Sequence, residues 1–120
     1  MFKHLNFPIL VINPAIGLHN VAGTQLDALF KALDGEGFEV LGAESLDEGR
    51  LIAEAHRGLS CILFTPDAEV SLHEVEALFS AAHSRSPELP IMALSTRQSI
   101  APELLAQLRE LHQIRGIIYL

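Results

Sequence analysis

The chain has 120 residues, of which 49% are hydrophobic and 19% are charged. That length suits one domain with one buried core, and that apolar fraction argues against a disordered chain. Eight lysines and arginines stand against fifteen aspartates and glutamates, and the formal net charge is −7. Such an acidic balance disfavours duplex nucleic acid and anionic membranes as partners.

Targeting and redox features are few. No apolar run approaches the ~20 residues needed to span a bilayer, and the N-terminal stretch is too polar and broken for a signal peptide. The single cysteine, Cys61, stands within an apolar run, which excludes an internal disulfide and fits a reducing compartment. We therefore expect a cytoplasmic protein.

Five short apolar runs predict β-strands. Four of the runs are apolar at every position, which is typical of strands covered on both faces of a sheet. The second run contains Glu39 and is therefore expected at a sheet edge. The runs cover residues 9–12, 38–41, 61–64, 91–94 and 117–120.

The segment after the first run predicts an amphipathic helix. We expect Thr24 to cap its N-terminus and Gly35 and Gly37 to end it. Its apolar side chains recur every three or four residues and form one stripe. This stripe consists of Leu26, Leu29, Phe30 and Leu33.

Three further helices are predicted. The second and third each begin with a capping box, at residues 45–48 and 71–74, and the fourth has Pro102 in its first turn. The second is expected to turn inward Leu51, Ile52 and Ala55. The third is expected to bury Val75, Leu78, Phe79 and Ala82. The fourth is expected to bury Leu104, Leu105, Leu108 and Leu111.

Strands that alternate with helices predict the α/β fold class. Right-handed crossovers then favour a flavodoxin-like or receiver-like three-layer sandwich, with a five-stranded parallel sheet in the order 2-1-3-4-5. Residues 1–120 are expected to form a single α/β domain. A sheet of this order normally has a final covering helix after strand 5, and this chain stops at Leu120. We therefore expect a fragment of a larger chain; the alternative is a native end covered by a partner.

Ligands of open parallel sheets bind at the carboxyl ends of the strands, near the point where the strand order reverses. Residues 13–18, which follow the first strand, contain one glycine and no Walker lysine, and this disfavours a nucleotide or a flavin. The candidate residues at this rim are Asn13, Pro14, Thr65, Pro66, Asp67, Ser95 and Thr96.

A phosphoryl-accepting receiver domain needs an acidic pair after strand 1 and an aspartate at the end of strand 3. Here Asn13 replaces the acidic pair, Thr65 stands at the end of strand 3, and Asp67 comes two residues late. The lysine expected after strand 5 is missing, because the only lysines in the chain are Lys3 and Lys31. Too little charge remains to hold Mg²⁺, so only a degenerate receiver is consistent with the sequence.

The sequence contains no complete set of residues for a metal site, a reactive cysteine or another catalytic site. No two of the six histidines are spaced i, i+4 as a helical metal pair requires, and Cys61 lies within a strand, where no helix N-terminus activates it. A small enzyme that uses Asp67 with Thr65 and Ser95 would lack a base or metal partner. We therefore predict no catalytic, cofactor-binding or metal-binding residue in this chain.

A family resemblance runs in order over nearly all 120 residues. It is carried by residues 7–12, 21–23, 36–38, 48–53, 89–94 and 111–120, with His56, Gly58, Leu59 and Cys61 between them. In these stretches the chain resembles the N-terminal wing domain of bacterial Orn/Lys/Arg decarboxylases, in the lysine/arginine branch of pseudomonads and their relatives.

The resemblance implies a larger parent enzyme, a fold-type I carboxy-lyase that uses pyridoxal phosphate to decarboxylate lysine, arginine or ornithine. The family's cofactor lysine lies in a Ser-x-His-Lys motif that this chain lacks. The implied role is a non-catalytic assembly domain that binds no cofactor itself. Its partners would be the other domains of the same polypeptide and further copies, from dimer to decamer. The alternative is a stand-alone degenerate receiver that acts by protein–protein contact.

Overall fold

The computed structural model describes residues 7–56, 58–65, 72–84, 87–95 and 117–119. Within them, strands and helices alternate as predicted. The elements are β1 (Phe7–Ile12), α1 (Val21–Gly35), β2 (Phe38–Ala43), α2 (Leu46–Ala55), β3 (Cys61–Phe64), α3 (Leu72–His83), β4 (Ile91–Ser95) and β5 (Ile117–Tyr119). The predicted fourth helix, with Pro102 and its four leucines, lies outside the described residues.

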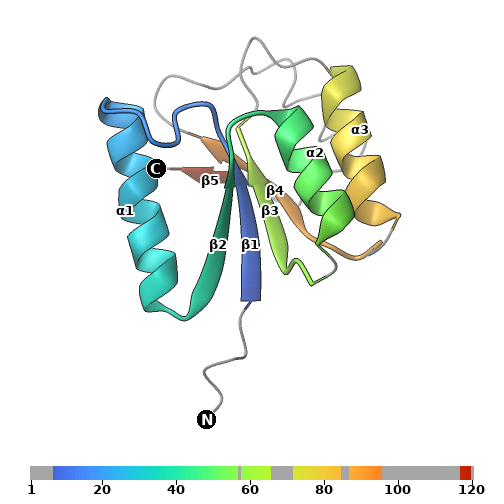
Figure 1. Ribbon diagram of the computed structural model, residues 1–120, viewed down its shortest axis with the longest axis horizontal. Coiled ribbons are helices and arrows are strands. Elements are labelled where there is room, and N and C mark those ends of the chain that lie inside the picture. The colour runs from blue at the N-terminus through green and yellow to red at the C-terminus, as the bar shows by residue number, and fades with distance from the viewer. Residues whose placement is uncertain (1–6, 57, 66–71, 85–86, 96–116, 120) are drawn as a thin grey trace.

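The sheet is parallel and has the order β2-β1-β3-β4-β5, which confirms the predicted topology (Figure 1). The strand that contains Glu39 lies at one edge, also as predicted. β1 and β2 are longer than their apolar runs because they stay in register from Phe7 opposite Phe38 to Ile12 opposite Ala43. The pairing brings the carboxyl ends of these two strands to the same level.

The sheet is covered on both faces, with α1 on one side and α2 and α3 on the other (Figure 1). Because side chains alternate along a strand, successive residues enter different cores. Leu10 and Ile12 pack in the core beneath α2 and α3, whereas Ile9 and Val11 pack in the core beneath α1. Two cores explain why the central strands are apolar at every position.

Helix α1 begins one residue after Asn20, whose Oδ1 accepts a hydrogen bond of 2.8 Å from the N–H of Gly23. The prediction that Thr24 caps this helix is therefore wrong. Asparagine is as good an N-cap as serine, and it stands four residues earlier, so the helix gains a turn. The predicted end is confirmed, because α1 stops at Gly35 and Gly37 adopts a positive φ of 94°.

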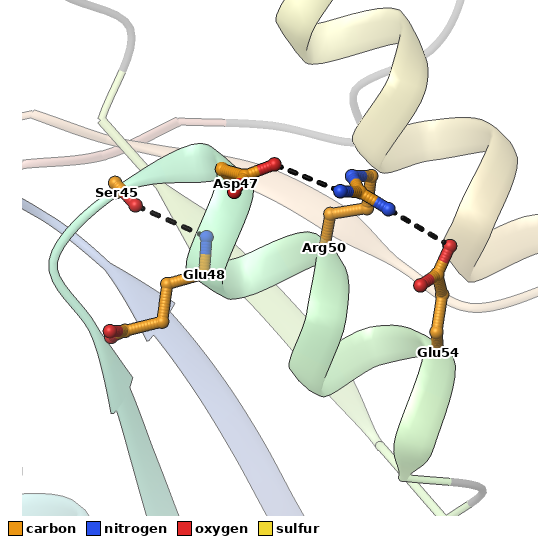
Figure 2. A network of polar contacts seen from close by, with 5 residues as sticks. All are labelled: Ser45, Asp47, Glu48, Arg50 and Glu54. Atoms are coloured by element: carbon orange, nitrogen blue, oxygen red, sulfur yellow. Dashed lines mark hydrogen bonds and ion pairs between the residues drawn. The ribbon is translucent and has the colours of Figure 1, made fainter.

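Helix α2 begins at the predicted capping box (Figure 2). The N–H of Glu48 donates to Oγ of Ser45 at 3.1 Å, and the Glu48 carboxylate accepts from the N–H of Glu44 at 3.0 Å. Further along, Arg50 bridges Asp47 and Glu54 on the outer surface of the helix, at 2.9 and 3.2 Å. The hydrogen bond to Asp47, followed by the charge of Glu54, raises the pKa of Arg50.

The predicted inward face of α2 is wrong in part. Leu51 is 53% exposed and Ala55 is exposed, whereas Ile52 is half-buried. The helix faces the sheet with Leu46, Gly49 and Ala53 instead. A Cβ atom at Gly49 would collide with the side chain of Ile12, so the missing side chain lets α2 approach β1 closely.

Helix α3 presents the predicted apolar face. Its four inward side chains are at most 3% exposed: Val75, Leu78, Phe79 and Ala82. The ring of Phe79 meets that of Phe64 edge to face, with centroids 5.9 Å apart, which ties the helix to β3. Ser71, the predicted cap, lies outside the described residues.

Candidate functional site

The candidate site is the rim where β1 and β3 end side by side. Ile12 and Phe64 are register partners, and each is the last residue of its strand. Asn13 and Thr65 follow them directly, so the parallel sheet places these two side chains together. This is the point at which the strand order reverses, because β1 lies between β2 and β3.

Asn13 is engaged through both its backbone and its side chain. Its N–H donates to the carbonyl of Ala43 at 2.9 Å, and its carbonyl accepts from the N–H of Ile16 at 3.3 Å. In the side chain, Oδ1 accepts from the N–H of Ala15 at 2.8 Å, and Nδ2 donates to Oγ1 of Thr65 at 2.5 Å. The first of these side-chain bonds closes a turn within the β1–α1 loop, and the second ties that loop to β3.

Burial seals this pair from solvent. Asn13 is 3% exposed and Thr65 is 4% exposed, and the N–H of Thr65 donates to the carbonyl of Ile12 at 3.2 Å. A buried amide and a buried hydroxyl that satisfy each other are stable in place, whereas separating them would leave polar groups without partners. The arrangement therefore acts as an internal clasp between two strands.

The structure brings together only part of the predicted rim. Pro14 is exposed in the turn next to Asn13. Ser95 ends β4, where it is the register partner of Tyr119 in β5. Three other predicted rim residues lie outside the described residues: Pro66, Asp67 and Thr96. Sequence reasoning placed Asn13 and Thr65 at the rim but missed their hydrogen bond; the signal was that both directly follow strands expected to be neighbours.

Cys61 shows the chemistry of a structural thiol. It is half-buried in β3, and burial raises the pKa of its thiol, so less of the reactive thiolate forms at neutral pH. Its Sγ lies 3.8 Å from the carbonyl of Ile62 as a weak donor. This placement agrees with the prediction that Cys61 lies within a strand.

Two of the described histidines, His56 and His83, make local contacts. Nε2 of His83 lies 3.1 Å from the carbonyl of Leu89, and its ring meets that of Phe79 edge to face. Nδ1 of His56 accepts a long hydrogen bond of 3.4 Å from the N–H of Gly58. Among the described residues, no group of three or more histidine, cysteine, aspartate or glutamate side chains gathers as a metal site.

A shallow hollow of about 430 Å³ lies beside the β1–α1 loop, over the first half of α1. Its apolar lining residues include Ile16, Leu18, Leu26 and Phe30. Gly23 allows this shape, because a Cβ atom there would collide with the carbonyl of Leu18. The hollow therefore has a mixed lining, in which apolar side chains stand beside the polar side chains of His19, Thr24 and Asp27.

Solved structures place the fold among receiver-like domains. A CheY-like response regulator receiver domain from Methanospirillum hungatei JF-1 matches with a TM-score of 0.68 at 19% identity, over 95% of this chain and 81% of that one. A structure titled as an adenylate cyclase from Rhodopirellula baltica matches with a TM-score of 0.67 at 18% identity, over 95% and 76%. At such identities the likeness concerns the fold alone. The fold is therefore that of a receiver-like α/β domain, and in the described part of its rim Asn13 and Thr65 are buried and bonded to each other.

Residues 21–120 match the family described as the Orn/Lys/Arg decarboxylase, N-terminal domain, and the chain belongs to that family. Lysine decarboxylase LdcA of Pseudomonas aeruginosa is 36% identical over 124 aligned residues, which cover 100% of this chain and 16% of LdcA. The solved structure of lysine decarboxylase A from Pseudomonas aeruginosa matches with a TM-score of 0.70 at 33% identity, over 93% of this chain and 16% of that one. These matches confirm the family expected from the sequence, and within the expected lysine/arginine branch they support the lysine side.

The chain matches only a small part of LdcA, so the match does not extend to the activity of the whole protein. The chain spans 16% of the length of LdcA, so most of that protein has no counterpart in these 120 residues. No helix in the described part of the chain is long and apolar enough to cross a membrane.

Proposed function

We propose that residues 1–120 form one non-catalytic domain, the N-terminal assembly domain of a longer decarboxylase that uses pyridoxal phosphate and acts on a basic amino acid. Family membership and the 16% coverage of LdcA support this role, because in such a relative the remaining length is available for the chemistry. The domain's partners would be the other domains of its polypeptide and further copies of itself, in the cytoplasm.

The observation that carries the non-catalytic role is the buried pair of Asn13 and Thr65 in the described part of the rim. The two side chains at the strand-order reversal, Asn13 and Thr65, are buried and bonded to each other. An open α/β sheet normally binds its ligand at this place. A domain that uses its ligand position to join β1 to β3 contributes structure and surface, which are what an assembly domain needs.

The lysine that the structure describes, Lys31, does not fit pyridoxal phosphate. The cofactor is held as a Schiff base on a lysine, and Lys31 is the one lysine in the described residues. Its side chain is 79% exposed on α1 and pairs with Asp27 at 3.2 Å. A lysine in water lacks the enclosed site that orients a cofactor and lowers the amine pKa. We therefore place the cofactor chemistry outside this domain.

A spectral and activity assay tests the absence of catalysis. The purified 120-residue chain is mixed with pyridoxal phosphate and, separately, with lysine, arginine and ornithine. We expect no saturable Schiff base absorption and no release of CO₂ above a control protein that exposes a similar number of lysines. A stoichiometric Schiff base band, or turnover of any of the three amino acids, would contradict the proposal.

A domain exchange tests the assembly role. In one variant of LdcA the aligned N-terminal segment is replaced by this chain, and in another the segment is deleted. Analytical ultracentrifugation of both, beside LdcA itself, compares the masses of the particles. We expect the exchanged protein to match LdcA and the deleted protein to form smaller particles; equal particles in the two variants would rule out an assembly role.

The alternative is a stand-alone degenerate receiver that acts by protein contact. Its support is the fold likeness to receiver domains at 19% identity. Reading the gene beyond codon 120 separates the two proposals. A downstream Ser-x-His-Lys core supports the decarboxylase domain, whereas a DNA-binding domain or an immediate stop codon supports the receiver.

A further inference from the structure

The outer surface of α1 carries apolar side chains that no described element covers. Val21 is 71% exposed and Leu18, in the preceding loop, is 51% exposed. Figure 1 shows the sheet on the inner side of α1 and no other described element on its outer side. The exposed residues spaced three and four apart along the helix form one surface, the α1 outer face: Val21, Thr24, Ala28, Ala32 and Gly35.

The charged residues beside the α1 outer face can pair with the same residues of a second copy. Asp27 and Lys31 stand one turn apart near the middle of α1, on one flank of the outer face, where they are 65% and 79% exposed and pair with each other at 3.2 Å. Because this pair is exposed, each of its charges can also meet the opposite charge of a second copy. A two-fold axis perpendicular to the helix and close to Ala28 would place Asp27 of each copy opposite Lys31 of the other. The same residues then meet on both sides, as an isologous contact requires.

The ends of α1 add a second complementarity. The first turn contains no acidic residue and the last turn contains no basic one, so neither end of the helix dipole is compensated within the helix. Asp34 and Glu36 are exposed at the C-terminal end instead. In an antiparallel pair these carboxylates approach the positive N-terminal end of the second helix, where negative charge is favourable.

Charge also argues against the opposite surface as the place of self-contact. The net charge of −7 repels a second copy in general. Helices α2 and α3 expose five carboxylates against the single described arginine, Arg50: Asp47, Glu48, Glu54, Glu74 and Glu76. On α1 the charged residues are Asp27, Lys31 and Asp34, so repulsion is smaller there.

We propose that the α1 outer face binds the α1 outer face of a second copy, with the two helices antiparallel and Ala28 close to the two-fold axis. The proposal rests on the assembly role stated above and names the surface that performs it. Small side chains at Ala28 and Ala32 allow the helices to approach, and Val21 with Leu18 covers the C-terminal end of the partner helix. One helix pair buries less than the ~1,200 Å² of a standard interface, so the contact alone is weak and adds to others in a larger chain.

Sedimentation equilibrium of the 120-residue chain, from about 1 μM to about 1 mM, measures the self-association constant. Three variants separate this surface from others. A28E places like charges at the axis, D27K removes the opposite charge, and D27K/K31D exchanges the two charges. L51E is the control, because it places the same new charge at an apolar, 53% exposed residue on α2, away from the α1 outer face.

We expect reversible dimerisation that A28E weakens at least ~10-fold, that D27K weakens several-fold, and that D27K/K31D restores, since like charges in contact are strongly unfavourable. L51E should associate as the unaltered chain does. A monomer at every concentration, an unaffected A28E, or an equal loss in L51E would overturn the proposal.

The domain exchange in LdcA distinguishes the two failures. If the exchanged protein reaches the size of LdcA while the isolated chain stays monomeric or its association ignores A28E, the assembly role stands and the α1 contact is wrong. If the exchanged protein is no larger than the deleted one, the assembly role itself is wrong.

Discussion

The side-chain amide of Asn13 donates a hydrogen bond to the hydroxyl of Thr65 across the ends of two neighbouring strands, at 2.5 Å and out of contact with water. The two residues are 52 positions apart in the chain. Their bond joins the β1–α1 loop to β3 at the one place where an open sheet of this order offers a ligand position. Several consequences for stability can be measured.

Replacing either partner should destabilise the domain. N13A leaves the Thr65 hydroxyl and the N–H of Ala15 without this partner, and T65V leaves the Asn13 amide unpaired, so each should lower the free energy of unfolding by about 1–3 kcal/mol. Urea unfolding followed by circular dichroism measures the change. T65S, which keeps the hydroxyl, is the control and should lose less than T65V.

The double variant N13A/T65V makes this prediction sharper. If the two side chains act as a pair, the double variant should lose less than the sum of the single ones, with a coupling of about 0.5–3 kcal/mol. Strictly additive losses would mean that the hydrogen bond contributes nothing to the stability of the clasp.

Two glycines of the same helix should respond in opposite directions to alanine. G23A forces a methyl group against the Leu18 carbonyl and should destabilise the domain by about 1–3 kcal/mol. G35A has open space around its Cβ position and should be neutral or stabilising by up to about 1 kcal/mol, since alanine favours helix. Unfolding at a low protein concentration measures both, and a G23A variant as stable as G35A would contradict the packing described for α1.

The capping box of α2 gives a third stability test. S45A removes the acceptor for the Glu48 N–H and should lower the free energy of unfolding by about 1 kcal/mol. S80A, in an exposed position on α3, is the matched control and should have almost no effect. If the two variants lose the same amount, the cap does not stabilise α2.

Cys61 predicts a loss of stability in alkali. Burial raises the pKa of its thiol above the ordinary value of 9.0, so in the folded state the thiol stays protonated where it already ionises in the unfolded state. The stabilisation of the folded state by the protonated thiol is therefore complete below about pH 9. It is lost as the pH rises through the folded-state pKa. Between about pH 8 and pH 10, the free energy of unfolding measured with urea should fall more steeply for the unaltered chain than for C61S. Equal slopes would show that the thiol titrates normally.

Much of the fold was predictable because its signals are local. Runs that are apolar at every position and capping residues at fixed offsets depend only on neighbours in sequence, and the strand order then follows from the handedness of crossovers. The four buried residues of α3 were predicted for this reason. The N-cap of α1 was missed because Thr24 and Asn20 are both good caps, and local pattern alone does not choose between them.

What depends on contact between distant elements was not predictable. Leu51 was expected in the core, yet Gly49 brings α2 so close to Ile12 that a different side of the helix faces the sheet. The pairing of Asn13 with Thr65 likewise needs the register of β1 with β3, which no local pattern contains. The positions of Asn13 and Thr65 at the rim could therefore be predicted, but the hydrogen bond between them could not.

Nuclear magnetic resonance of the isotopically labelled chain tests the central claim most directly, because it reports on Asn13 and Thr65 themselves. The rim is titrated in turn with pyridoxal phosphate and with Mg²⁺ plus beryllofluoride, a mimic of a phosphoryl group. We predict that the resonances of the Asn13 side-chain amide and of Thr65 keep their positions throughout both titrations. Saturable shifts of these two residues in either titration would show that the rim binds a reactive group, and would contradict a purely structural clasp.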